Sequence, residues 1–168
     1  MLKITFHPDS DQEDYASIIE DYQKLWKKEG KRIVETIQKF SGLKFKESQI
    51  NAIVYKGSLS ARSRPLSLHA NVPEDVRKGT LVHELCHRVL AGNKVRIKFD
   101  DYKNASLEIH KVLNLILFDI WEELYEKKFA DDMVAWESKS RSGVYKKAWE
   151  YALSFSKKER EENFKKLI

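Results

Sequence analysis

The sequence predicts an α+β fold in which a small antiparallel or mixed sheet packs on long helices. Short segments with alternating apolar and polar residues occur at the start and in the first half of the chain, and this period of two is typical of strands. Longer segments carry an apolar residue every three or four positions, as amphipathic helices do. No repeat or linker interrupts the 168 residues, so we expect a single domain over residues 1–168.

The chain is expected to begin with a strand and a long helix. Residues 2–6 alternate between apolar and polar side chains, which indicates a strand. Ser10 and Glu13 have the spacing of a capping box, the pattern that starts many helices. Apolar residues then keep helical spacing to about Ser41, and Gly42 provides the stop.

Two further strands are expected before the centre of the chain. Residues 50–55 and 65–70 are rich in the residues that strands favour, and the leading Pro65 suits an edge strand. Residues 95–99 predict either a short strand or a loop. We expect the remainder to be helical, with a second long helix from about residue 105 to residue 129 or beyond and one or two helices after it.

The central helix is expected at about residues 73–91. Pro73 suits a first helical position, and the acidic residues that follow it favour the positive end of the helix dipole. Gly92 and Asn93 supply a stop. Apolar residues on both sides of its middle turns can form a buried stripe, so residues of this helix are expected to lie against the core.

This helix carries the pattern HExxH at residues 83–87. His83 and His87 are four residues apart, so their imidazoles project from one helix face and can bind one Zn²⁺. Glu84 is placed to accept a proton from a water on such a metal. The alternative interpretation is two ordinary histidines on a half-buried helix. The pattern predicts a zinc-dependent hydrolase with Glu84 as the catalytic base.

A catalytic zinc usually has three protein ligands, and four downstream residues are candidates for the third. Asp119 lies in a strongly apolar helical segment, where a carboxylate must be paired or bound to metal. Asp119 and Glu123 share a helix face, so one can ligate while the other orients an imidazole. Glu122 is the next alternative. His110 is expected instead to be a partly buried histidine that is hydrogen-bonded within the helices.

The same residues carry a family resemblance. The HExxH pattern and the segment of residues 123–131, Glu-Leu-Tyr-Glu-Lys-Lys-Phe-Ala-Asp, resemble the gluzincin zinc metallopeptidases and, more narrowly, small intracellular zincins such as the minigluzincins. The resemblance covers about residues 50–131. It implies a zincin-like fold, Zn²⁺ as cofactor, and Glu123 as the third ligand. Glu126 departs from the family pattern, in which a small residue is common at that position.

The resemblance also implies a peptide or protein substrate and hydrolysis through a metal-activated water. In minigluzincins a C-terminal segment covers the cleft, which implies self-inhibition by residues 156–168; the same residues fit a terminal amphipathic helix equally well. A second hypothesis keeps the fold and the zinc but makes the chain a non-catalytic binding or regulatory module.

Composition excludes several other classes. The net charge is +5, but basic residues alternate with acidic ones and no nucleic-acid-binding motif is present, so we expect no specific nucleic-acid partner. No apolar run has transmembrane length, and residues 1–7 lack a signal-peptide pattern. With Cys86 as the single cysteine, no internal disulfide can form. We therefore expect a cytoplasmic protein without membrane attachment.

Three further positions have open interpretations. Cys86 is expected to pack in the core, with a redox-sensitive thiol as the alternative. The strand before the central helix carries Ser67 and His69. In zincin folds such a strand often pairs with an extended substrate, so these residues can line a cleft, although surface positions are the simpler expectation.

Overall fold

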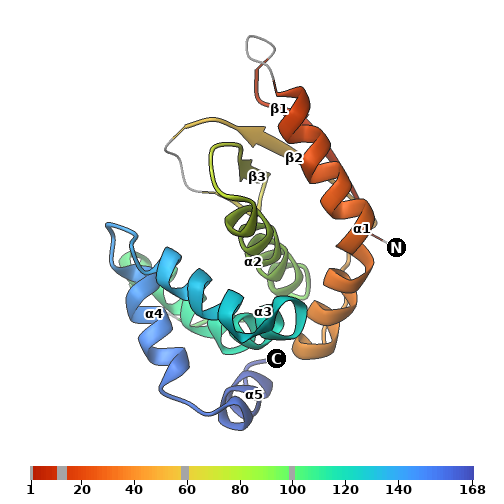
Figure 1. Ribbon diagram of the computed structural model, residues 1–168. Helices are drawn as coiled ribbons and strands as arrows, with labels where there is room; N and C mark the ends of the chain where they lie inside the picture. Colours follow the sequence, from red (N-terminus) through yellow and green to blue (C-terminus); the bar gives the residue numbers. More distant parts are fainter. Residues whose placement is uncertain (1, 11–14, 58–60, 99–100) are drawn as a thin grey trace. The chain divides into compact units, whose positions relative to one another are not determined.

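The computed structural model describes residues 2–10, 15–57, 61–98 and 101–168. It divides into two compact units, one made of residues 1–38 and 43–93 and the other of residues 39–42 and 94–168. Figure 1 labels the helices and strands of both units. Within the described residues the fold is α+β, as predicted. The expectation of a single domain stays a prediction.

The first unit is built on a three-stranded parallel sheet. Strands β1 (Lys3–Pro8), β2 (Gln49–Tyr55) and β3 (Leu66–His69) lie in the order β1-β2-β3, and both neighbouring pairs run parallel. The predicted antiparallel or mixed pairing of these strands is therefore wrong. The connection between β1 and β2 gives the reason, because helix α1 (Ala16–Ser41) returns the chain so that both strands start at the same end of the sheet.

The sheet buries the alternating apolar residues that predicted its strands. Ile4 and Phe6 of β1 are buried while their polar neighbours are exposed. The Phe6 ring stacks on Tyr22 of α1 with ring centroids 5.3 Å apart. The Tyr22 hydroxyl donates a hydrogen bond of 2.8 Å to the carbonyl oxygen of His69. This bond joins α1 to the end of β3, so the sheet and the helix share one core.

Helix α1 ends at Ser41, as predicted, and it contains a glycine, Gly30, near its middle. Its described part begins at Ala16, and the expected capping residue Glu13 lies outside the described residues. At Gly30, a Cβ atom would lie 2.7 Å from the ring of Trp26. The Trp26 indole therefore packs against the backbone of Gly30, one turn further along the helix, where a side chain would collide with it. This contact explains why the helix contains a residue of low helix propensity.

The second unit is helical. It contains a short 3-10 helix η1 (Tyr102–Asn104), then α3 (Ala105–Glu137), α4 (Val144–Leu153) and α5 (Lys157–Lys165). A strand or a loop was predicted for residues 95–99; residues 95–98 form no strand, and Phe99 lies outside the described residues. The apolar segment of α3 is buried, with Trp121 against Trp149 of α4 at 5.5 Å between ring centroids.

Helix α5 confirms a terminal amphipathic helix. Ser156 caps it, and Ser156 and Glu159 form a capping box. The buried side chains of Arg160 and Phe164 anchor its inner face, although its other positions are strongly charged. Across the described residues, none of the helices is both long and apolar enough to cross a membrane.

Helix α3 is interrupted at Glu126. This residue has φ 76° and ψ 163°, so two helical segments meet there. That region of backbone space is adopted easily only by glycine, because a Cβ atom collides with the backbone in it. Glu126 is also the position at which the sequence departs from the family pattern. The break therefore stores local strain in the middle of α3.

We predict that Glu126→Gly stabilises the protein. Removing the Cβ atom relieves the strain, and we expect the free energy of unfolding to rise by about 1 kcal/mol, measured by chemical denaturation. The matched control is Lys128→Gly, at an exposed helical position, which should lower it by about 1 kcal/mol. A loss of stability in both variants would contradict the strained conformation of Glu126.

Candidate metal centre

The HExxH pattern lies on α2 (Glu74–Gly92), in agreement with the predicted helix at residues 73–91. Pro73 is the N-cap, and Glu74 and Asp75 occupy the first turn. At the other end, the Asn93 amide donates hydrogen bonds of 2.8 Å to the carbonyl oxygens of Val89 and Lys44. The second bond ties the end of α2 to the segment before β2.

The apolar stripe of α2 is fully inside the first unit. Leu81, Val82 and Leu85 have no exposed surface. His83 and Glu84 lie in the same turns on other faces of the helix, and they are only 3% and 5% exposed. A charge or an imidazole lone pair at such a position is shielded from water, which strengthens its interaction with any nearby ion.

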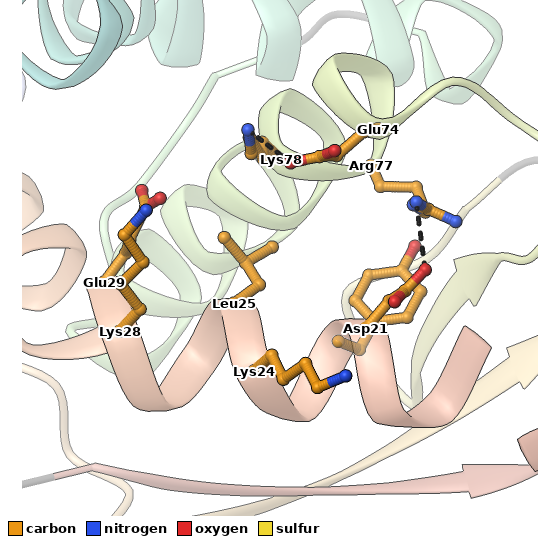
Figure 2. A pocket seen from close by; sticks show the side chains of 9 residues that line it. Asp21, Lys24, Leu25, Lys28, Glu29, Glu74, Arg77 and Lys78 are labelled. Atoms are coloured by element: carbon orange, nitrogen blue, oxygen red, sulfur yellow. Dashed lines mark hydrogen bonds and ion pairs between the residues drawn. The ribbon is translucent and has the colours of Figure 1, made fainter. Parts of the chain in front are cut away.

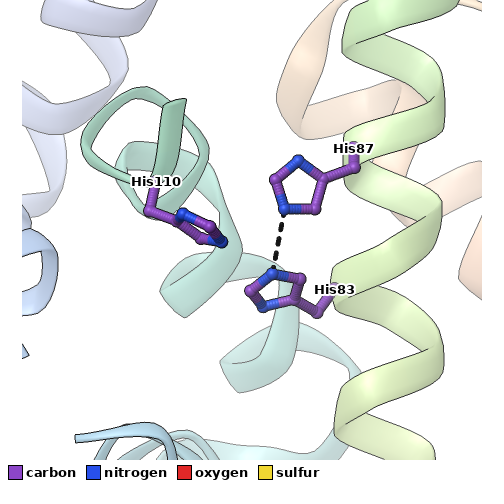
Figure 3. A group of neighbouring side chains, drawn as sticks. All are labelled: His83, His87 and His110. Carbon is purple, nitrogen blue, oxygen red and sulfur yellow. Dashed lines mark hydrogen bonds between the residues drawn. The ribbon is translucent and has the colours of Figure 1, made fainter. Parts of the chain in front are cut away.

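The two histidines converge on one point. The Nε2 atoms of His83 and His87 are 3.1 Å apart, and the two rings project from successive turns of α2 (Figure 3). Two nitrogens bound tetrahedrally to one Zn²⁺ at 2.0–2.1 Å would be separated by about 3.3 Å. The observed separation fits that geometry within a few tenths of an ångström. The histidine pair can therefore bind a metal ion.

Glu84 acts electrostatically on the end of the sheet. Burial and then the negative charge of Glu84 raise the pKa of Tyr55 to about 12. The Tyr55 hydroxyl therefore stays protonated and lies 3.2 Å from Nε2 of His69, its parallel neighbour on β3. Burial lowers the pKa of His69, which favours the neutral ring. This contact of Tyr55 was not predictable from sequence spacing, because it depends on the register of β2 and β3.

The outer edge of β3 is already hydrogen-bonded. Both backbone groups of Ser67 bond to Arg62, with N···O distances of 2.8 and 3.1 Å, in an isolated antiparallel bridge. The carbonyl oxygen of His69 accepts the bond from Tyr22. An extended peptide that added at this edge would have to displace these bonds. The expected pairing of a substrate with β3 is therefore not supported by this edge.

Arg88 follows His87 and fixes the rotation of α2. Its guanidinium forms a two-pronged hydrogen bond with the Glu47 carboxylate and also donates to the carbonyl oxygen of Ser63. These partners come from the segments before β2 and before β3. Because a planar guanidinium requires all partners in one plane, the helix is held at one rotation about its axis and His87 with it.

The three predicted acidic ligands all have cationic partners within the second unit. Asp119 accepts hydrogen bonds of 3.0 and 2.7 Å from Nε and Nη2 of Arg160 on α5. The nearest Glu122 oxygen lies 3.4 Å from Nζ of Lys157. From the sequence we expected Asp119 to be either paired with a cation or bound to a metal, and the structure shows it paired. The sequence did not identify the partner, Arg160, which is 41 residues away.

Glu123, the ligand implied by the resemblance, is about half exposed. Its carboxylate accepts a hydrogen bond of 2.6 Å from Lys39 at the end of α1. That bond and the charge of Lys39 lower the pKa of Glu123. The side chain can leave this exposed pair easily, because solvent replaces the lysine. The assignment of Glu123 as a ligand stays a prediction.

His110 is buried on α3, as the sequence suggested, and it has a defined tautomer. Its Nδ1 lies 2.6 Å from the carbonyl oxygen of Ser106, so Nδ1 carries the proton and donates it. The lone pair is then on Nε2, the usual arrangement in a metal-ligating histidine. The Tyr145 ring packs against the imidazole with centroids 4.5 Å apart, which fixes the ring plane.

A separate pocket of about 250 Å³ lies in the first unit between side chains of α1 and α2 (Figure 2). Two ion pairs line it: Arg77 donates to Asp21 at 3.4 Å, and Lys78 pairs with Glu74 at 2.7 Å. Lys24, Lys28 and Glu29 line it as well, so its charged side chains are of both signs.

Comparisons of this chain with known proteins found no match. No protein-family model matches the chain, and neither a curated protein nor a solved structure shows significant similarity to it. The resemblance to gluzincins therefore stays a prediction, supported by the HExxH helix alone.

We predict that Arg160→Met strongly destabilises the protein. It removes both hydrogen bonds of the buried Asp119 carboxylate and leaves only the exposed Lys157, 3.8 Å away, as a cationic partner, so we expect a loss of about 3–5 kcal/mol in the free energy of unfolding. Lys157→Met is the control, since this exposed lysine should contribute less than about 1 kcal/mol. Equal small losses in the two variants would contradict a structural role of the buried pair.

Cys86 is predicted to be inert in the folded protein. The side chain has no exposed surface, and burial followed by the charge of Glu84 raises the pKa of its thiol. A thiol-specific reagent should therefore modify Cys86 in denaturant but not in buffer at pH 8, as measured by mass spectrometry. Rapid modification of the folded protein would instead favour the redox-sensitive interpretation.

Proposed function

We propose that this chain is a zinc-dependent peptidase in which His83 and His87 hold the metal and Glu84 is the catalytic base. The observation that carries the proposal is the convergence of the two Nε2 atoms at 3.1 Å on a buried helix, with a carboxylate between them in the sequence. An imidazole pair with this separation is suited to one ion, and a glutamate directly after the first histidine is suited to proton transfer.

For the third ligand we propose His110. The hydrogen bond from Nδ1 of His110 to Ser106 sets the tautomer that a ligand needs, and the neutral ring requires no displacement of a cation. The carboxylates of Asp119, Glu122 and Glu123 would each have to give up an ion pair first. Glu123 is the alternative.

The chemistry follows from the donor set. A bound zinc ion lowers the pKa of a coordinated water and polarises a peptide carbonyl. Glu84 accepts a proton and later passes it to the leaving amine. Its low exposure keeps competing water away from the carboxylate, and the rigid backbone of α2 holds it at a constant position relative to His83.

The same burial also supports a second candidate function. Structural zinc sites are closed to solvent, and His83 and Glu84 are almost inaccessible. A non-catalytic zinc module would need the metal for its stability but not the Glu84 carboxylate. Self-inhibition by residues 156–168 stays a separate prediction. The two functions differ in what the replacement of Glu84 does.

We predict about one zinc per chain in the purified protein, measured by elemental analysis after reconstitution. His87→Ala and His110→Ala should lose the metal, because each removes a ligand. Glu123→Ala should keep it. Retention in His110→Ala together with loss in Glu123→Ala would assign the third ligand to Glu123, and a wild-type protein without zinc would refute the metal centre itself.

We predict that Glu84→Gln abolishes peptide hydrolysis while zinc content is unchanged. The amide cannot accept the proton, so turnover of a quenched-fluorescence peptide library should fall by about 10²–10⁴-fold. The control is Glu74→Gln, an exposed glutamate of the same helix, which should leave turnover intact. Zinc binding without hydrolysis in the wild type, with Glu84→Gln unaltered in stability, would favour the non-catalytic module.

A further inference from the structure

The turn between α3 and α4 concentrates positive charge. It joins two helices of the second unit, from the end of α3 at Glu137 to the start of α4 at Val144 (Figure 1). Residues 138–149 contain four basic residues and no acidic one, whereas the whole chain has a net charge of +5. A charge almost equal to that of the whole chain therefore lies in this short segment. The basic residues, all of them exposed, are Lys139, Arg141, Lys146 and Lys147.

Most of these cations lack the acidic partners that other exposed lysines of the unit have. Earlier on α3, for example, Lys127 pairs with Asp131 one turn away, at 2.6 Å. Within the part of the chain that the structure describes, no carboxylate lies within ion-pair distance of Lys139, Arg141 or Lys147. The turn therefore presents positive charge that the protein itself does not neutralise.

Local structure does not require these cations. Basic side chains near the end of a helix often bind its last carbonyl oxygens. At the end of α3, the carbonyl oxygens of Val134, Trp136 and Glu137 already accept backbone hydrogen bonds of 3.0–3.2 Å from the turn. Lys146 lies 4.0 Å from Glu150, which is a weak exposed pair. The unpaired charges repel one another, and a negatively charged partner would offset that repulsion.

Aromatic rings lie beside the cations. Trp136 is 42% exposed, and the Lys139 ammonium lies 5.9 Å from the centroid of its ring. Tyr151 is 39% exposed and follows Lys147 by four residues on α4, so the two side chains share a helix face. Positive charges that neutralise phosphates and aromatic rings that stack on bases are the two features by which proteins bind single-stranded nucleic acids.

The same surface is poorly suited to a membrane. A helix that lies on a bilayer inserts a continuous apolar face between the lipids. The apolar face of α4 is already inside the second unit, because Ala148, Trp149 and Ala152 are at most 1% exposed. This leaves Leu153 as the large aliphatic side chain that α4 exposes. A polyanion that carries flat rings fits the surface better than a lipid layer does.

We propose that the turn between α3 and α4, together with Trp136, binds single-stranded nucleic acid without sequence preference. Lys139, Arg141 and Lys147 contact phosphates, and the Trp136 indole stacks on a base. The positive end of the α4 dipole adds to the attraction. Phosphate contacts carry no sequence information, so the inference agrees with the absence of a motif for specific recognition. It does not depend on the metal centre or on the proposed peptidase activity.

The test is a fluorescence-anisotropy titration of the full chain with a fluorescein-labelled oligothymidylate at several salt concentrations. A triple variant removes the three unpaired charges of the turn through Lys139→Gln, Arg141→Gln and Lys147→Gln. A control removes the same number of charges at exposed lysines that have acidic partners, through Lys127→Gln, Lys128→Gln and Lys165→Gln. Far-UV circular dichroism checks that each variant is folded.

We expect the triple variant of the turn to bind about 10–100-fold more weakly at low salt, because it releases fewer counterions. The slope of log affinity against log salt concentration should become shallower by about 2, which corresponds to three lost phosphate contacts. The control should keep the slope of the wild type. Trp136→Ala should weaken binding about 10-fold with an unchanged slope, because it removes stacking but no charge. Trp136→Phe should recover most of that loss.

Several results would overturn the inference. They are an absence of wild-type binding at low salt, equal losses in the two triple variants, and wild-type affinity in Trp136→Ala. Binding to vesicles that contain phosphatidylserine, without binding to the oligonucleotide, would assign the surface to a membrane instead. If the triple variant does not fold, Arg141→Gln alone takes its place, with an expected change in slope of about 0.7. Because zinc takes part in none of these measurements, they leave the proposed function untouched.

Discussion

The packing of one face of α2 against the sheet is the constraint on which the rest of the candidate site depends. Leu81, Val82 and Leu85 are fully buried and contribute to the core, and the same turns of α2 carry His83 and Glu84, which are also buried. Arg88, through Glu47, prevents the helix from rotating to release them. Stability and site geometry are thus set by the same contacts, so neither can vary without the other.

The elements that the sequence predicted well are those specified by neighbouring residues. The bounds of α2 follow from Pro73 at one end and Gly92 with Asn93 at the other, and the alternation in β1 directly gives its buried face. The direction of the strands was predicted wrongly, because parallel and antiparallel neighbours bury the same alternating pattern. What decides between them is the path of the connecting segments, which local spacing does not encode.

The candidate site divides in the same way. The spacing within HExxH fixes two imidazoles and a carboxylate on one helix, so this part was predictable. The third ligand was not, because the state of each acidic residue on α3 depends on a distant partner. Arg160 from α5 neutralises the charge of Asp119, and no sequence pattern near residue 119 indicates that this arginine is its partner. The tautomer of His110 likewise depends on a carbonyl oxygen that only the folded helix presents.

The bonds along the outer edge of β3 have a consequence for association between molecules. An edge strand with open backbone groups is a template on which another chain can extend the sheet, and such edges are a common start of aggregation. Here the bridge from Arg62 occupies Ser67, and the Tyr22 hydroxyl occupies the carbonyl oxygen of His69. The side chain of Tyr22 on α1 and a short turn that contains Pro65 thereby close this edge to self-association.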